Sequence, residues 1–241
     1  MTRLFGSISA VFLLAAITVS FPTNMQAQPV PGTRLLPEVL ETELALSALP
    51  VHLRSGAGVL LLESGGYVRS RDSENGFECL VRRHGAIPGI FSDTIAPVCY
   101  DAEGAGTVMQ AVLDEVAMLQ EGTEPTEVAE TINERWADSA YDLPGPGISY
   151  MLSPVFRLNG RDDAFVPHLM FYAPNKSNPD VGAGEDRLSY VPWIQAAGRP
   201  SAVMVVPVGI QERKAIAQQE SGLIARVKDY LAGLTEAENM N

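Results

Sequence analysis

The sequence predicts an α+β protein with a largely antiparallel sheet of about five or six strands. Helices are expected to pack mainly on one face of that sheet, with a further helix at the C-terminus. Strand-like segments cluster on both sides of a pair of helical patterns, an order of elements typical of this class. The apolar runs at residues 58–62 and 202–206 are bounded by turn residues and have the length of strands. These two observations place a sheet at the centre of the predicted fold.

Three strand candidates follow one another closely at residues 58–62, 67–71 and 77–82. Turn signals separate them, Ser64-Gly65-Gly66 in the first case and an Asn-Gly pair at residues 75–76 in the second. Because such short connections join antiparallel neighbours, we expect a meander at the start of the sheet. Later strands are expected at residues 148–152, 167–172 and 202–206, and residues 173–198 are expected to form one long irregular segment.

Four helical patterns complete the predicted domain, at residues 37–49, 107–120, 123–136 and 212–234. Each has apolar residues on one stripe, and Gly122 separates the middle two by so short a connection that they should form an antiparallel pair. The last helix can either pack on the sheet or project as an arm for self-association. The sequence pattern leaves both alternatives open.

The first 27 residues have the layout of a secretory signal peptide. Arg3 precedes an uncharged apolar run that reaches Phe21, and a polar stretch then ends in the small residue Ala27. The run is short for a membrane span of roughly 20 residues, which disfavours an uncleaved anchor. We predict cleavage after Ala27, a secreted or periplasmic location, one α+β domain over residues 28–211 and an amphipathic helix over residues 212–241.

Composition limits the classes of partner. The chain has 241 residues, 46% of them apolar, and a net charge of −12. Arg3 is the only charged residue of the signal peptide, so its loss leaves 16 basic and 29 acidic residues and a net charge of −13. So acidic a surface disfavours nucleic acid, whose binding needs a basic footprint. No later stretch is long and apolar enough to span a membrane, so we expect a soluble protein without stable membrane insertion after cleavage.

Cys79 and Cys99 are the only cysteines and are expected to form one disulfide. Disulfides form in oxidising compartments, and an exported chain with two cysteines has a single possible pairing. Closing a loop of about 21 residues stabilises the folded state by roughly 3 kcal/mol in the chain-entropy model. The alternative is a reactive thiol, but the chain has no C-x-x-C motif to support it.

Four residues are the candidates for catalysis: His84, Asp101, Glu103 and His168. Carboxylates and imidazoles are the usual general acids, general bases and metal ligands. Asp101 and Glu103 also lie just before a predicted helix, where capping is a simpler role for them. Because none of the four has the spacing of a metal-binding or catalytic motif, we predict no metal and no cofactor.

A second set of residues is typical of ligand binding. Arg83, with its neighbour Arg82, could clamp an anion bidentately. Asn175, Asp180 and Trp193 flank the long irregular segment, where amide, acidic and aromatic side chains could bind a sugar or a peptide. The simpler interpretations are an exposed basic pair at a strand end and an ordinary surface connection.

Four short motifs carry a resemblance to other proteins: F-x-C-L-V-x-R from Phe77, C-x-D-A-E-G from Cys99, Y-M-L from Tyr150 and P-H-x-M-x-Y-A-P from Pro167. On these motifs, roughly residues 40 to 208 resemble a group of exported bacterial proteins that have no assigned function. The resemblance implies a bacterial, extracytoplasmic setting and one domain that contains all four segments. It carries over no catalytic role.

These observations favour an exported, non-enzymatic binding or accessory module that is stabilised by one disulfide. Its partner would be a small molecule, a glycan or a protein. The alternative is an extracytoplasmic hydrolase or metal-dependent enzyme that uses His84, Asp101, Glu103 and His168. A third hypothesis is an interaction protein that acts through its C-terminal helix.

Overall fold

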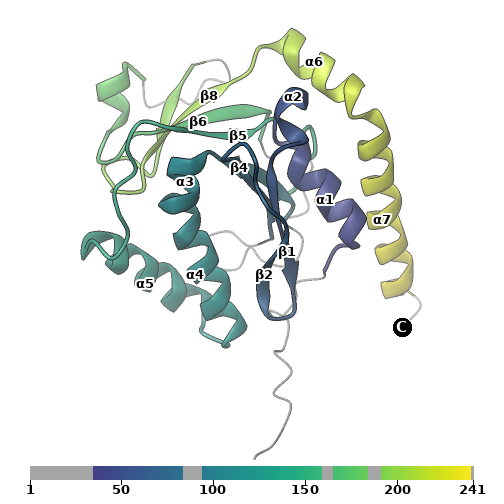
Figure 1. The fold of residues 1–241 in the computed structure, drawn as a ribbon, viewed down its shortest axis with the longest axis horizontal. Helices are drawn as coiled ribbons and strands as arrows, with labels where there is room; N and C mark the ends of the chain where they lie inside the picture. Colours follow the sequence, from purple (N-terminus) through teal and green to yellow (C-terminus); the bar gives the residue numbers. More distant parts are fainter. Residues whose placement is uncertain (1–34, 84–93, 159–164, 184–190, 240–241) are drawn as a thin grey trace, which may run out of the picture.

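The computed structural model describes residues 35–83, 94–158, 165–183 and 191–239 (Figure 1). The described chain is α+β, as predicted, with an eight-stranded sheet in place of the five or six strands expected. The elements in chain order are α1 (Glu38–Ser47), α2 (Val51–Arg54), β1 (Gly58–Glu63), β2 (Gly66–Arg71), β3 (Glu78–Arg82), β4 (Ala96–Tyr100), α3 (Ala102–Gly106), α4 (Val108–Gln120), α5 (Pro125–Ala137), β5 (Ile148–Met151), β6 (His168–Tyr172), the 3-10 helix η1 (Asn178–Val181), β7 (Trp193–Gln195), β8 (Val203–Pro207), α6 (Ile210–Gln219) and α7 (Ser221–Asn239).

The sheet is mixed, with the strand order β2-β1-β3-β4-β5-β6-β8-β7. Every neighbouring pair is antiparallel except β1 and β3, which run parallel. The meander expected at the start is therefore wrong, because β3 pairs with β1 and not with β2. The chain reaches that side because Glu74 and Asn75 both donate their main-chain N–H groups to the Gly56 carbonyl, which ties the connection across the start of β1.

Two strands were not expected from the sequence. β4 begins at Ala96, where the sequence predicts no strand, and β7 lies inside the long segment expected to be irregular. Pro97 interrupts the usual strand pattern, yet it lies outside the part of β4 that pairs with β5, where a missing N–H is tolerated. β7 has only three residues, too few for any periodicity, and it exists because β8 pairs with it.

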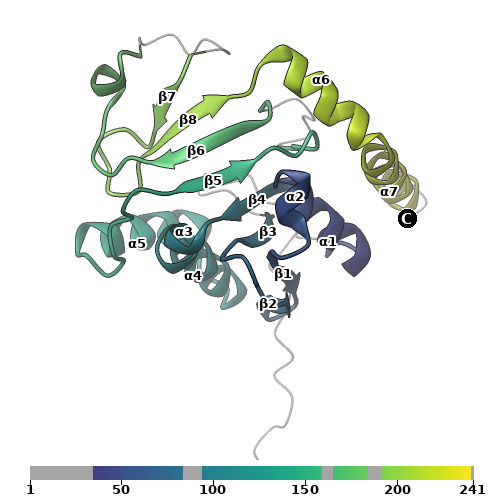
Figure 2. The same cartoon turned by 45° about the horizontal axis from the view of Figure 1, so that its top comes forward.

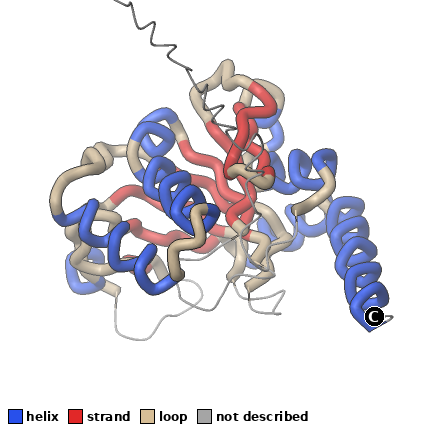
Figure 3. The backbone as a smooth tube through the Cα atoms, turned by 90° about the horizontal axis from the view of Figure 1, so that it is seen from below, coloured by secondary structure: helices blue, strands red, loops and turns tan. Residues whose placement is uncertain are grey.

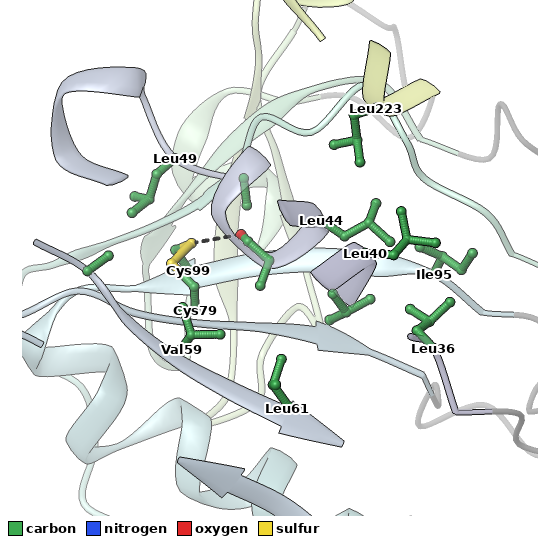
Figure 4. Packing of buried hydrophobic residues seen from close by; sticks show 14 of the residues in the cluster. Leu36, Leu40, Leu44, Leu49, Val59, Leu61, Cys79, Ile95, Cys99 and Leu223 are labelled. Carbon is green, nitrogen blue, oxygen red and sulfur yellow. Dashed lines mark hydrogen bonds between the residues drawn. A yellow bond between two sulfur atoms is a disulfide. The ribbon is translucent and has the colours of Figure 1, made fainter. Parts of the chain in front are cut away.

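Helices cover both faces of strands β1, β3 and β4, which corrects the expectation of helices mainly on one face (Figures 2 and 3). On one face, α1 and α7 pack on the cluster that contains Val59 and Cys79 (Figure 4). On the other face, Met109 of α4 packs on Leu60 and Leu80. Side chains alternate along a strand, so each of these three strands contributes to both clusters. This double coverage explains the continuous apolar run of β1, in which only Glu63 is exposed.

The predicted C-terminal helix is two helices, α6 and α7, that meet at Glu220. None of the ten residues of α6 is buried. α7 packs on the domain through its buried residues Leu223 and Val227, and an ion pair between Arg226 and Glu43 of α1 adds to this contact. The apolar stripe that suggested an interaction arm is thus used within the chain. Within the part of the chain that the structure describes, no helix is both long enough and apolar enough to cross a membrane.

Candidate functional site

Cys79 and Cys99 form a disulfide, with the two sulfurs 2.06 Å apart, as predicted. The cysteines are direct partners in the register of β3 and β4, and both side chains are fully buried beneath α1 (Figure 4). The Cys99 sulfur lies 3.3 Å from the carbonyl oxygen of Ala45. Because a disulfide sulfur carries no hydrogen, this is a packing contact and not a hydrogen bond. The pair joins two neighbouring strands inside the core, and its burial keeps it from solvent.

Asp101 organises the start of the helical layer. Its Oδ1 accepts a hydrogen bond from the N–H of Gly104 at 2.9 Å, which caps α3. Its Oδ2 accepts the N–H of Ile148, the first residue of β5, at 2.8 Å. The hydroxyl of Tyr172 also donates to Oδ1, at 3.1 Å. One carboxylate therefore joins α3, β5 and β6, a structural role that is broader than the capping expected.

Glu103 holds the chain that enters β5. Its Oε1 accepts a hydrogen bond from the N–H of Gly145 at 2.6 Å. Charge-assisted hydrogen bonds of this length are among the stronger ones in proteins. Glu103 and Asp101 thus both bind main-chain N–H groups of the segment from Gly145 to Ile148, and this contact accounts for both acids.

Tyr172 is a buried member of this network that the sequence did not reveal. Its hydroxyl lies 2.8 Å from the hydroxyl of Ser149 on β5, in addition to its bond to Asp101. Burial raises the pKa of Tyr172 far above its ordinary value, so the phenol is neutral and can donate a hydrogen. The tyrosine needs glycine beside it, because a Cβ on Gly147 would lie 2.7 Å from its ring and a Cβ on Gly104 would overlap its hydroxyl.

His168 lies at the opposite end of β6 from Tyr172. They are four positions apart along the strand, which corresponds to about 13 Å at roughly 3.3 Å per residue. The imidazole is buried, its Nδ1 lies 2.7 Å from the carbonyl oxygen of Val166, and burial lowers its pKa. The structure therefore does not bring His168 to Asp101. His84, the fourth catalytic candidate, lies outside the described residues. Among the described residues, no cluster of three or more His, Cys, Asp or Glu side chains could hold a metal ion.

Arg83 is buried, in contrast to the exposed basic pair that the sequence suggested. Its Nε donates to the carbonyl oxygen of Thr94 at 2.7 Å, so the guanidinium ties the end of β3 to the chain that enters β4. The neighbouring Arg82 binds Glu115 of α4, with Nη2 and Oε2 3.0 Å apart. Glu78, four positions before Arg82 in the sequence, pairs with Arg69 of β2. Neither arginine is arranged as an open clamp for an anion.

Two buried acids accompany these arginines, and both were missed from the sequence. Glu41 of α1 and Glu115 of α4 are 1% and 6% exposed. Each lies on the buried face of its helix, Glu41 one turn before Ala45 and Glu115 one turn before Leu119. An acid inside an apolar stripe was the signal that could have identified them.

Glu41 and Tyr67 form hydrogen bonds with main-chain groups of β1 and β3 at the point where these two strands separate. These strands pair only at Gly58 with Glu78 and at Val59 with Cys79. Further along, the N–H of Leu62 donates to Oε1 of Glu41 at 3.0 Å, and the hydroxyl of Tyr67 donates to the carbonyl of Val81 at 2.8 Å. A buried main-chain N–H or C=O group without a hydrogen-bond partner destabilises the fold. Here the two side chains supply the hydrogen bonds that strand pairing does not.

The ligand-binding candidates of the irregular segment have structural roles as well. Asp180 accepts hydrogen bonds from the N–H and the hydroxyl of Ser177, which caps η1, and these bonds lower its pKa. Trp193 lies on β7 and packs against the cluster that contains Val205. Asn175 has a φ of 64° in a turn, and its N–H donates to the carbonyl of Arg199.

In contrast, the described helices leave an apolar surface uncovered on the second half of the sheet. Met170 and Tyr172 of β6 point to the face that carries α3 and α4, so alternation places Leu169 and Phe171 on the other face. Figure 2 views this other face, and no described helix is drawn across β6 and β8 there. We call it the open sheet face; it consists of Ile148, Tyr150, Leu169, Phe171, Met204 and Val206.

The register arranges these six residues in two cross-strand rows. Phe171 lies between Ile148 and Met204 in the first row, and Leu169 lies between Tyr150 and Val206 in the second. All six are partly exposed, and Phe171 is the most exposed at 38%. Contiguous exposed apolar side chains of this kind mark interaction surfaces.

Comparisons of the chain with protein-family models, with curated proteins and with solved structures found no match. The resemblance to exported bacterial proteins therefore stays a prediction, and the function is argued from the geometry of the site.

Proposed function

We propose that the protein is an exported, non-enzymatic binding module that holds an apolar segment of a partner protein on its open sheet face. The observation that carries this proposal is the pair of apolar rows centred on Leu169 and Phe171. Neither row contains a charged side chain, and the hydroxyl of Tyr150 is the one polar group in them, although the chain as a whole is strongly acidic. A partner with apolar side chains matches such a surface.

The shape of the surface favours a protein segment over a small molecule. Three neighbouring strands span about 10 Å at roughly 4.8 Å between strands, and the two rows lie about 7 Å apart along the strands. A flat area of this kind does not enclose a small ligand, which usually buries most of its surface in a cleft. The apolar side chains of a helix or of an extended segment can cover it.

The placement of the catalytic candidates supports binding over catalysis. Asp101 and Glu103 bind main-chain N–H groups, and His168 lies at the opposite end of β6 from Tyr172, the residue of that strand that binds Asp101. An acid–base pair has to share contact with one substrate. The positions of Asp101, Glu103 and His168 therefore favour binding over the alternative, a hydrolase or metal-dependent enzyme that uses these residues.

The first test measures the binding of Nile red, a neutral apolar probe, to the open sheet face by the gain in its fluorescence. Phe171→Ser and Met204→Ser should each reduce the fluorescence gain of the purified exported chain by more than half. Val39→Ser and Leu143→Ser are the matched controls, because these residues are 72% and 52% exposed elsewhere on the molecule. Equal losses in all four variants would contradict the proposal.

The second test looks for the partner itself. A photo-crosslinking amino acid at position 171 of the exported chain should yield one discrete protein adduct in the producing cell. The same amino acid at position 39 should not, and Met204→Glu should remove the adduct at position 171. Identical adducts from both positions would exclude the open sheet face as the binding surface. Turnover of an ester or peptide substrate that His168→Gln abolishes without unfolding would instead establish the enzyme.

A further inference from the structure

A histidine and three methionines gather on the face of the sheet that carries α3 and α4. His168 and Met170 are two positions apart on β6, so their side chains lie on the same side of the strand. Met151 of β5 is the direct partner of His168 in the strand register, and its side chain lies on that side too. Met109 of α4 packs in one apolar cluster with Met151 and Met170. We call these four residues the methionine–histidine cluster.

The methionines are not spread evenly over the molecule. The described residues contain five methionines, and three of them belong to the methionine–histidine cluster. Of the other two, Met118 packs with Leu119 and Val128, and Met204 lies on the open sheet face. Methionine is also an adaptable filler of apolar cores, so the gathering by itself does not indicate a ligand.

His168 supplies the independent observation that indicates a ligand. Its side chain is 3% exposed, and its Nδ1 lies 2.7 Å from the carbonyl oxygen of Val166. Nδ1 therefore carries the ring hydrogen, and Nε2 has a lone pair but no hydrogen-bond partner among the described residues. Burial lowers the pKa of His168, so the imidazole is neutral at pH 7. Histidines that bind metals usually donate the other ring N–H to a carbonyl or carboxylate in this way.

The strand geometry brings the donor atoms of the cluster within reach of one another. Directly opposed residues such as His168 and Met151 have Cβ atoms about 4.5–5.5 Å apart. Met170 is two positions from His168 on the same strand, which corresponds to about 7 Å. Because a methionine side chain has three rotatable bonds, its sulfur can turn towards the imidazole without a change in the main chain.

The surroundings of the cluster favour an ion of low charge. The ring centroids of Phe165 and His168 are 6.0 Å apart, and Phe156 lies 5.1 Å from Phe165 and packs on the cluster that contains Met151. Imidazole and thioether ligands are neutral, and burying an uncompensated divalent charge among apolar side chains is costly. Thioethers are also soft ligands, which select Cu(I) over harder ions.

We propose that the methionine–histidine cluster binds one Cu(I) ion through Nε2 of His168 and the sulfur atoms of Met151 and Met170, with Met109 as a further ligand from α4. No carboxylate or thiolate takes part, so Zn²⁺ and Mg²⁺ are not expected to bind there. No local motif marks the site, because its residues belong to β5, β6 and α4 and meet only in the folded chain. The site lies on the opposite face of the sheet from the open sheet face and does not depend on the function proposed for that face.

The test uses the purified exported chain and Cu(I), kept reduced by ascorbate in the absence of oxygen, with bathocuproine disulfonate as the competing chelator. The parent should bind one equivalent of Cu(I), and an excess of Zn²⁺ should not displace it. Met151→Leu and Met170→Leu keep the volume of the core and should each weaken binding by at least about tenfold. Even the loss of an outer-shell partner of a ligand costs about 10–100-fold in metal affinity. His168→Gln should have the same effect.

Met118→Leu and Met204→Leu are the matched controls, because they make the same change outside the cluster. Each should bind Cu(I) within about twofold of the parent. The conservative methionine variants test the site even if His168→Gln unfolds the chain. The proposal is overturned if the parent does not bind Cu(I) saturably, if either Met151→Leu or Met170→Leu binds as tightly as the parent, or if the two controls lose as much affinity.

Discussion

The carboxylate of Glu41 accepts a hydrogen bond from the main-chain N–H of Leu62 at 3.0 Å, in a position where the glutamate is 1% exposed. Burial raises the pKa of Glu41 from 4.5 to about 7, and the bond to Leu62 and the positive charge of Arg83 only partly oppose this rise. The folded protein thus holds a proton on Glu41 more tightly than the unfolded chain does. Its contribution to stability is fully present below pH 4.5 and is lost as the pH rises to about 7.

We predict that Glu41→Gln removes this dependence on pH. Glutamine keeps an oxygen for the N–H of Leu62 and has no charge to bury. The shift of the pKa corresponds to about 3 kcal/mol at 1.36 kcal/mol per pH unit, so the variant should gain up to about that much unfolding free energy at pH 8. Urea unfolding from pH 4 to 8 measures it, with the exposed Glu38→Gln as the control. A parent and a variant with equal slopes between pH 4.5 and 7 would contradict the prediction.

The ion pair of Arg82 and Glu115 should be sensitive to the loss of one partner. Burial raises the pKa of Glu115, and Arg82 opposes that rise. The Oε1 atom of Glu115 has no hydrogen-bond partner among the described residues. Arg82→Gln should therefore lower the unfolding free energy at pH 7 by about 3 kcal/mol, the lower end for a buried pair, because the arginine is 29% exposed.

This loss should be smaller at pH 5, because a raised pKa lets the unpaired Glu115 take up a proton as the pH falls. The double variant Arg82→Met/Glu115→Leu removes both charges and should recover most of the loss at pH 7. Chemical unfolding of the parent and of these two variants at both pH values measures this. A double variant as unstable as Arg82→Gln would show that the charge is not the cause.

The disulfide should stabilise the chain without being reactive. Its cysteines are 20 residues apart in the sequence, so Cys79→Ala/Cys99→Ala should lower the unfolding free energy by roughly 3 kcal/mol in the chain-entropy model. A maleimide reagent should label no cysteine in the folded parent and two after unfolding and reduction. Labelling of both cysteines in the folded protein without reductant would overturn the assignment.

The hydroxyl of Tyr172 should stabilise the folded state through its hydrogen bonds with Ser149 and Asp101. Tyr172→Phe removes both hydrogen bonds and leaves a buried serine hydroxyl behind, so we expect a loss of about 1–3 kcal/mol in unfolding free energy. Ser149→Ala should cost less in the Tyr172→Phe background than in the parent, because the shared bond is already absent. A double-mutant cycle measures the difference, and strict additivity would contradict the contact.

Export should depend on the apolar run near the N-terminus. A charge placed inside that run, as in Leu14→Arg, is expected to retain the chain in the cytoplasm. Mass spectrometry of the exported parent should show a chain that begins at Gln28. An exported chain that begins at Met1 would contradict the predicted cleavage.

The sequence suggested capping as the role of the candidate acids, which the structure confirms for Asp101 and not for Glu103, and it did not indicate the side chains that surround them. Asp101 stands before a helix, which is a local pattern, and the structure confirms that it caps α3. Tyr172 and Ser149 belong to β6 and β5, 71 and 48 positions away from Asp101 along the chain. Contacts between such distant segments depend on how the strands align, and no local pattern encodes that alignment.

By itself, the sequence determined the α+β class, most of the helices and strands, and the pairing of Cys79 with Cys99. These properties follow from local periodicity, from turn residues and from a cysteine count that allows a single pairing. The tertiary structure alone decided that β1 and β3 run parallel, that helices cover both faces of β1, β3 and β4, and that no described helix covers the face with Leu169 and Phe171. Strand order and coverage depend on packing between distant segments, and that packing decides which of two alternating faces is buried.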